Sequence, residues 1–305
     1  MSSTNPRSQI ELFVDPHMRA QIHHRQFRDK FFIGFFRSVT YAIVLLVGAI
    51  LFDISYHGFP VMSWSFLSEF PRQGGLAGGI FPAIIGTLCL VLTALAVAVP
   101  LGVLSAIYLV EYAPDTRITR FLRLAIMTLA GVPSIVFGLF GLAFFVIILG
   151  FGTSILAGGL TLACMILPTM IVTTSEALRA VPKGLREGSL ALGATKWQTI
   201  LYNVLPYSFS GVLTGAILSL GRAAGETAPI LLTVAAFYLS RAPRSIFDQV
   251  MALPYHLYIL ATQHPNMQEA APKQYGTALV LVLLVLGLSS LAAMIRQRFR
   301  EKYRW

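Results

Sequence analysis

Two long stretches of the sequence contain no charged residue, and they limit the fold more than any other feature. One stretch runs from Gln73 to Val110 and the other from Leu124 to Ser175. As a single helix the second would be about 78 Å long at 1.5 Å per residue, so it must fold back once. Because a transmembrane helix needs about 20 predominantly apolar residues, the sequence predicts an all-α integral membrane protein.

The apolar segments predict six transmembrane helices. Only 12% of the residues are charged, whereas soluble domains carry about 25%, so this chain could not cover a globular surface. Residues 1–37 are expected to form a polar N-terminal arm without a cleavable signal peptide, and residues 38–305 the transmembrane domain. The predicted spans are residues 38–56, 80–110, 124–149, 155–174, 207–239 and 275–295.

The distribution of basic residues predicts the orientation. Eighteen Lys and Arg residues lie before the first span, in the second–third and fourth–fifth loops, and after the last span, against four in the other loops. The positive-inside rule therefore places both termini in the cytoplasm. The net charge of +10 is then a topology signal, and no nucleic-acid partner is expected. Cys89 and Cys164 lie in apolar runs and are expected to be small buried hydrophobes.

The longest predicted cytoplasmic loop, residues 176–206, is amphipathic. One helical piece is expected to end at Pro182, because proline cannot continue the backbone bonding. A second piece is expected to begin near Gly184, and Gly193 separates it from a third piece whose apolar face includes Trp197. Two interpretations remain open: a helix that packs on its own membrane domain, and a helix offered to a soluble partner.

Two opposite charges stand inside the predicted fifth span. Arg222 and Glu226 are four residues apart and would share one helix face. A charge at the bilayer centre costs about 2.5–3.5 kcal/mol on insertion scales. The pair could be an intrahelical salt bridge that neutralises itself, or it could face a water-filled path, as intramembrane ions usually do. Thr227 adds a hydroxyl at the same level.

A proline interrupts the predicted third span. Pro133 would remove one backbone hydrogen bond from this helix, and Ser134 is a candidate to bind the freed carbonyl. Three nearby glycines would let another helix approach closely. The segment is either a kinked packing helix or a moving gate element, and the two interpretations are compatible.

The loop resembles the EAA loop of ABC importer permeases, which docks into a cleft of the cytoplasmic ATPase subunit. The matching positions are Glu187, Gly193, Leu205 and Pro206, and the departures are Gly188 and Ser189 for two alanines and Asn203 for an isoleucine. The resemblance implies that this loop couples the ATPase to the membrane helices through the matching residues Glu187, Gly193, Leu205 and Pro206. Trp197, on the apolar face of the third piece, is expected to be a further coupling residue.

Two further stretches resemble the permeases of the bacterial phosphate importer, the Pst system, and its PstA type more than its PstC type. They are the segment around Pro133 and the segment GRAAGETAPILL, residues 221–232. The resemblance implies a six-helix type I ABC importer (MetI-like) permease fold in the bacterial inner membrane. It also implies that Arg222 and Glu226 are important for transport, and with the neighbouring hydroxyl of Thr227 they form the expected substrate path.

The resemblance further implies the partners and the cargo. They are inorganic phosphate, a second PstC-like permease, a homodimeric PstB-like ATPase and a periplasmic PstS-like phosphate-binding protein. The chain has no G-x-x-x-x-G-K-[ST] segment, so it is not expected to be an enzyme. It is expected to bind no cofactor and no metal, because ATP and Mg are used by the partner ATPase.

The chemistry of phosphate sharpens the hypothesis for the ion pair. A guanidinium group matches phosphate through two parallel hydrogen bonds, so Arg222 is expected to line the path and Glu226 to hold Arg222 when phosphate is absent. A sulfate or molybdate permease would suit Arg222 equally well. An ion-coupled secondary carrier is a rival class, but such folds often show internal repeats and none is evident. An intramembrane enzyme is disfavoured because no His lies within a predicted span.

Overall fold

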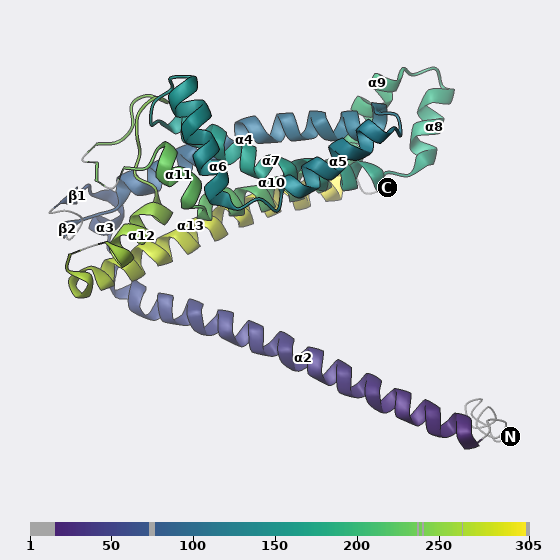
Figure 1. Ribbon diagram of the computed structural model, residues 1–305, viewed down its shortest axis with the longest axis horizontal. Coiled ribbons are helices and arrows are strands. Elements are labelled where there is room, and N and C mark those ends of the chain that lie inside the picture. Colours follow the sequence, from purple (N-terminus) through teal and green to yellow (C-terminus); the bar gives the residue numbers. More distant parts are fainter. Residues whose placement is uncertain (1–15, 73–76, 237, 240, 264, 303–305) are drawn as a thin grey trace. The chain divides into compact units, whose positions relative to one another are not determined.

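The computed structural model describes residues 16–72, 77–236, 238–239, 241–263 and 265–302, and these are almost entirely helical (Figure 1). The chain divides into two compact units, residues 1–55 and residues 56–305. Most of the first unit is a single helix, α2 (Pro16–Gly58). Its stretch from Ser38 to Phe52 contains no charged residue and is mostly apolar, which is typical of a membrane span.

The second unit contains the remaining elements. In chain order they are η2 (Phe59–Val61), α3 (Trp64–Ser68), β1 (Pro71–Arg72), β2 (Ala77–Gly78), α4 (Phe81–Ile107), η4 (Tyr108–Tyr112), α5 (Arg117–Leu129), α6 (Ser134–Gly141), η5 (Leu142–Ile148), α7 (Ile155–Arg179), α8 (Lys183–Ala191), α9 (Lys196–Thr199), η6 (Ile200–Val204), α10 (Leu205–Gly225), α11 (Ala228–Thr233), α12 (Leu253–Thr262) and α13 (Met267–Lys302). The segments η4, η5 and η6 are π-helical. The two short strands pair antiparallel, with Pro71 opposite Gly78.

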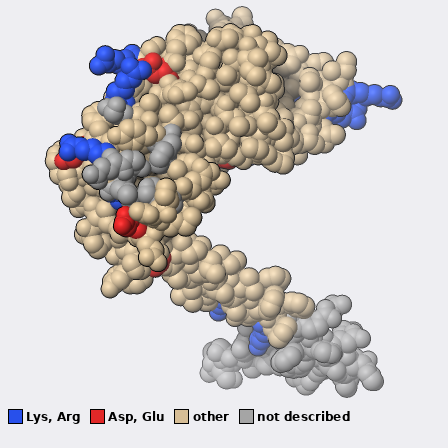
Figure 2. Space-filling model, turned by 60° about the vertical axis from the view of Figure 1, so that its left-hand side comes forward, with Lys and Arg blue, Asp and Glu red and all other residues tan. Residues whose placement is uncertain are grey.

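Six stretches are candidates for crossing a membrane. Five helical stretches among the described residues are long and apolar enough: Asp29–Val61, Phe81–Tyr112, Ile155–Arg179, Lys196–Gly225 and Met267–Phe299. The sixth candidate is α5 together with α6 and η5, a pair bent by 102°. On the face of the second unit seen in Figure 2, charged side chains are few and lie near its two ends. The predicted all-α membrane fold is confirmed.

The core of the second unit is the contact between α4 and α7, with α10 packed on α7 and α13 on α10. Small residues allow this close approach, as is common between membrane helices. Ala94 and Ala98 of α4 have no exposed surface, and a Cβ added at Gly102 would lie 2.7 Å from the Cβ of Met170. Cys89 and Cys164 are unpaired and partly buried against this core.

The prediction of one helix over residues 207–239 is wrong. Helix α10 ends at Gly225, Glu226 is extended (φ −77°, ψ 133°), and α11 covers only Ala228–Thr233. Pro229 explains the break, because proline has no N–H to donate back to α10 and is tolerated in the first turn of a new helix. Helices α7 and α13 extend beyond their predicted spans, since helical hydrogen bonding does not stop where an apolar run stops.

The single helix expected over residues 124–149 is also wrong. Pro133 is the N-cap of α6, with ψ 139°, and it stands outside both helices. It therefore removes no hydrogen bond from a helix interior, and Ser134 has no freed carbonyl to serve. Helix α5 ends instead in a turn in which the N–H of Gly131 bonds to the carbonyl of Thr128 (3.0 Å). A proline disfavours the helical conformation in the residue before it, which here is Val132. This restriction separates α5 from α6.

The packing predicts the effect of a side chain at Gly86 of α4. A Cβ at this position would overlap the backbone carbonyl oxygen of Met251, and backbone cannot rotate away. We expect Gly86→Val to lower the free energy of unfolding by about 1–3 kcal/mol, measured on the purified protein in detergent. The matched control is Gly287→Val in α13, where an added Cβ meets nothing within 4 Å. Equal destabilisation by both variants would contradict this account of the core.

Candidate functional site

The ion pair expected from the sequence forms at the end of α10. Arg222 lies in the last turn, and its Nε is 3.5 Å from Oε1 of Glu226; their side chains are 34% and 21% exposed. Because Glu226 is extended, the pair closes across the helix end and does not lie along a helix face. A cation in the last turn of a helix is favourable for the helix dipole. The pair is thus neither sealed in the core nor fully solvated.

The surroundings of the pair leave it accessible. A Cβ added at Gly221 or Gly225 would meet nothing within 4 Å, whereas Ala223 and Ala224 between them are buried. Glu226 is the one acidic partner of Arg222 in the part of the chain that the structure describes. A guanidinium carries five N–H donors, so Arg222 keeps donors for an anion that approaches from the open side.

Thr227 lies where α11 begins. Its backbone carbonyl accepts the N–H of Leu231 (3.1 Å), which caps the new helix, while its side chain makes no capping hydrogen bond. Thr227 is half-buried. Its hydroxyl is therefore next to Glu226 in the chain and is not consumed by the helix cap.

The structure brings together the two segments that carry the proline motifs. A Cβ added at Gly138 of α6 would lie 3.0 Å from the carbonyl oxygen of Ala228 and 3.1 Å from Cα of Pro229, so α6 packs directly on α11 (Figure 1). Ser134, at the start of α6, makes no hydrogen bond to Arg222 or Glu226 among the described residues. Helix α6 contacts α11, which follows the ion pair, and its Phe137 belongs to the same buried cluster as Ala223 and Ala224 of α10.

The five residues of the EAA-like loop fall into two groups. Glu187 on α8, Gly193 and Trp197 on α9 are exposed. Gly193 has φ +85°, in the left-handed region that glycine adopts without steric cost, and this turn separates α8 from α9. The exposed group is the part of the loop that a partner subunit could contact.

Leu205 and Pro206 belong to the second group. They form the first turn of α10 and are partly buried. Leu205 packs on a buried cluster that includes Ile107 of α4 and Leu178 of α7. These two motif residues anchor the loop to the membrane helices of their own chain.

The two polar departures from the EAA pattern bind each other. The side-chain amide of Asn203 donates to the hydroxyl of Ser189 (3.0 Å), and that hydroxyl is 3.0 Å from the hydroxyl of Thr199. Ser189 lies on α8, and the other two residues lie on α9 and η6. These hydrogen bonds hold α8 against α9 and η6 across the turn at Gly193. The alanine and isoleucine of the EAA pattern would make apolar contacts at the same place.

Sequence reasoning missed an ion pair beneath the loop. Arg186 of α8 and Glu111 of η4 are 75 residues apart, and their atoms Nη2 and Oε1 lie 2.8 Å apart. In the sequence Arg186 was only one of the cytoplasmic charges. A signal existed, because Glu111 is the first charged residue after the uncharged stretch that begins at Gln73.

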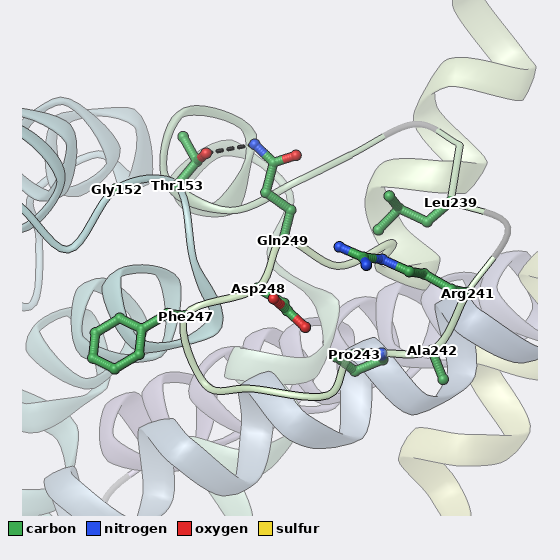
Figure 3. A pocket seen from close by; sticks show the side chains of 9 residues that line it. All are labelled: Gly152, Thr153, Leu239, Arg241, Ala242, Pro243, Phe247, Asp248 and Gln249. Carbon is green, nitrogen blue, oxygen red and sulfur yellow. Dashed lines mark hydrogen bonds between the residues drawn. The ribbon is translucent and has the colours of Figure 1, made fainter.

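A hollow of about 410 Å³ opens between the loop after η5 and residues 239–249 (Figure 3). The Asp248 carboxylate in it accepts backbone N–H groups of Arg244 and Ser245 (2.8 and 3.1 Å), which hold the pKa of Asp248 below its usual range. The side chain of Arg241 extends into the same hollow (Figure 3). The residues that line it do not include Arg222 or Glu226, so it is separate from the ion pair.

Comparison with known proteins identifies the family. The family of binding-protein-dependent transport system inner membrane components matches residues 98–304. The phosphate transport system permease protein PstA 1 of Mycobacterium tuberculosis is 38% identical over 269 residues, which cover 86% of this chain and 86% of that protein. The probable ABC transporter permease protein YqgI of Bacillus subtilis is 32% identical over 279 residues, covering 88% of this chain and 95% of that protein.

Solved structures show the same fold at low sequence identity. A chain of a bacterial ABC transporter involved in the import of alginate superposes with a TM-score of 0.62 at 15% identity, over 91% of this chain and 99% of that chain. A chain of the MetNI methionine ABC transporter gives a TM-score of 0.54 at 18% identity, over 72% and 94%. The predicted type I importer permease fold is confirmed. The chain therefore belongs to the family of binding-protein-dependent transport system inner membrane components, as the membrane permease of an ABC transporter and not its ATPase.

Proposed function

We propose that this chain is a permease subunit of an ATP-driven importer of inorganic phosphate. Relatives that share 38% of their residues with it over most of its length are named as phosphate transport system permeases. The guanidinium of Arg222, which is open on one side, matches the geometry of a phosphate oxyanion. Thr227 offers a further hydrogen bond at the same level.

One observation carries the proposal: the coupling loop and the ion pair lie at opposite ends of a single helical run. Residues Lys196–Gly225 form one continuous helical stretch of 30 residues, about 45 Å long at 1.5 Å per residue. Trp197 is exposed near its beginning and Arg222 lies in its last turn. A rigid-body displacement of the loop by a closing ATPase thus moves Arg222 directly.

Glu226 acts as the competitor of phosphate for Arg222. Without phosphate, the carboxylate neutralises the guanidinium at 3.5 Å and lowers the cost of holding two ions in the membrane domain. When phosphate arrives, it displaces Glu226, and the carboxylate repels the anion so that the site cannot trap it. Helix α6, with Pro133 and Ser134 at its start, bears on α11 and acts as the gate behind the pair.

The partners follow from the exposed surfaces and from the family. A homodimeric cytoplasmic ATPase, which uses ATP and Mg, docks on the exposed loop residues Glu187 and Trp197. A second permease completes the translocation path, and a periplasmic binding protein delivers phosphate at the other end. Both termini, with the arm of residues 1–37, lie in the cytoplasm, and lipid surrounds the spans of the inner membrane.

A related oxyanion is the alternative cargo, because sulfate and molybdate also suit a guanidinium. Competition distinguishes them: excess sulfate or molybdate leaves uptake of labelled phosphate into proteoliposomes unchanged if phosphate is the cargo. Strong inhibition by either oxyanion would change the assigned cargo and leave the class of transporter as it is.

We expect Arg222→Gln to reduce phosphate uptake by at least about tenfold, because a hydrogen bond to a charged group contributes about 1.5–3 kcal/mol. Glu226→Gln should also stop uptake, since Arg222 then holds the anion without a competitor. Uptake is measured in proteoliposomes that contain the reconstituted complex, and co-purification of the subunits reports assembly.

The matched control is Arg179→Gln, which breaks an exposed pair at the end of α7 (3.4 Å to Glu176). It should leave uptake unchanged because exposed ion pairs contribute little. Full uptake in both Arg222→Gln and Glu226→Gln would reduce the pair to a structural salt bridge.

The loop geometry predicts that Gly193→Asp uncouples the complex. A side chain at φ +85° is strained by about 1–2 kcal/mol, so the angle between α8 and α9 changes. We expect phosphate uptake to fall at least about fivefold, the lower end of typical coupling between sites, while the protein still inserts into the membrane. Gly184→Asp, in the first turn of α8 with open space around it, is the control. Normal transport by Gly193→Asp would refute the coupling role.

A further inference from the structure

The segment η4, with the sequence YLVEY, continues α4 at the end that faces the coupling loop. Its five residues, Tyr108–Tyr112, are π-helical, and the N–H of Ala113 bonds to the carbonyl of Tyr108 (2.8 Å) to close it. Single π turns inside longer helices are frequent at functional sites. The π turn η4 thus lies where the core helix α4 meets the coupling loop.

Three cations from three different elements converge on this segment. The contacts are Arg123 Nη2 of α5 to the carbonyl of Leu109 (2.8 Å), Arg186 Nε and Nη2 of α8 to Oε1 of Glu111 (3.1 and 2.8 Å), and Lys196 Nζ of α9 over the ring of Tyr112 (4.9 Å to its centroid). Two of the three cations, Arg186 and Lys196, come from the coupling loop. In the described part of the chain, no other segment is contacted by cations from both α8 and α9.

Arg186 joins α8 to a second core helix as well. Its guanidinium donates to the carbonyls of Leu178, in the last turn of α7, and Val181, just beyond that helix (2.7 Å each). Its own side chain is 20% exposed and that of Glu111 is 9% exposed. One side chain of the loop thus holds the ends of α4 and α7, the two helices whose contact forms the core.

The burial of this pair separates it from the other ion pairs at the same end of the bundle. Arg179–Glu176 is 3.4 Å and Arg120–Asp115 is 3.8 Å, and in both pairs about half or more of each side chain is exposed. Exposed pairs contribute little. Arg186 and Glu111 in contrast depend on each other, because losing one leaves the other charge buried without compensation.

We propose that η4 is the point at which movement of the coupling loop enters the helix bundle, with Arg186 and Glu111 as its positioning residues. The inference rests on the proposed function in that an ATPase moves the loop. Helix α9 continues into α10 and moves the Arg222 end directly. Helix α8 moves α4 and α7 through Arg186, so the core and the ion-pair helix shift together.

Hydrogen exchange tests the inference without reference to the cargo. The complex with its ATPase is placed in lipid nanodiscs, and exchange is measured with and without a non-hydrolysable ATP analogue. In the native protein the analogue should alter exchange in α8, in residues 108–112 and at the end of α7. In Arg186→Gln and Glu111→Gln the change in α8 should remain, and the change at the other two places should disappear.

Matched controls and a double variant complete the test. Lys183→Gln on α8 and Glu176→Gln on α7 remove an exposed charge of the same sign and should behave as the native protein. Phosphate uptake per ATP should fall at least about fivefold in each test variant. The double variant Arg186→Gln/Glu111→Gln should be no worse than either single variant, because neighbours that act as a unit are not additive.

Arg186→Lys keeps the inference testable if the glutamine variants fail to assemble. An ammonium group keeps the charge pair with Glu111 but lacks the guanidinium fork, so the response at residues 108–112 should persist and that at the end of α7 should be lost. Persistence of both responses in Arg186→Gln, or their equal loss in the control variants, would overturn the proposal. If the exchange pattern holds while the native complex takes up no phosphate, the inference stands and the proposed cargo fails.

Discussion

A backbone carbonyl or N–H cannot face hydrocarbon without a hydrogen-bond partner, and the architecture depends on this constraint. Inside its predicted spans the chain leaves helical geometry and then resumes it at two places, around Pro133 and around Glu226. Such breaks are tolerated only where protein or water covers them. Here the helices that follow the two breaks, α6 and α11, pack on each other. One of the two breaks therefore lies at the half-buried Arg222–Glu226 pair at the end of α10.

The fold could be predicted from the sequence because the uncharged stretches leave no other solution. The places where the prediction failed have a common cause. Hydropathy measures how apolar a segment is and is blind to backbone geometry, so residues 207–239 read as one span although Pro229 ends the helix. The same limit applies to the bend before α6: a proline predicts an interruption, but the 102° angle follows from packing on α11.

The site was only partly predictable. Arg222 and Glu226 could be found because charge is rare in an apolar run, and the loop because its anchors keep a fixed spacing. Leu205 and Pro206 match the same motif but pack inside their own chain, a difference that spacing does not reveal. The pair of Arg186 with Glu111 joins residues 75 positions apart. Only tertiary structure brings them together, as it does Ser189 and Asn203.

The π turn η6 has a consequence for rotational phase. It lies between α9 and α10, and a π turn accommodates one residue more than an α turn before the helix repeats. If Ile200–Val204 wound as an ordinary α-helix, everything beyond it would rotate by about 100° around the helix axis, the share of one residue in a turn of 3.6. Arg222 would then point toward a different neighbour. The direction in which Arg222 points around the helix axis is thus set by η6, some twenty residues away, within the loop that the proposed ATPase would move.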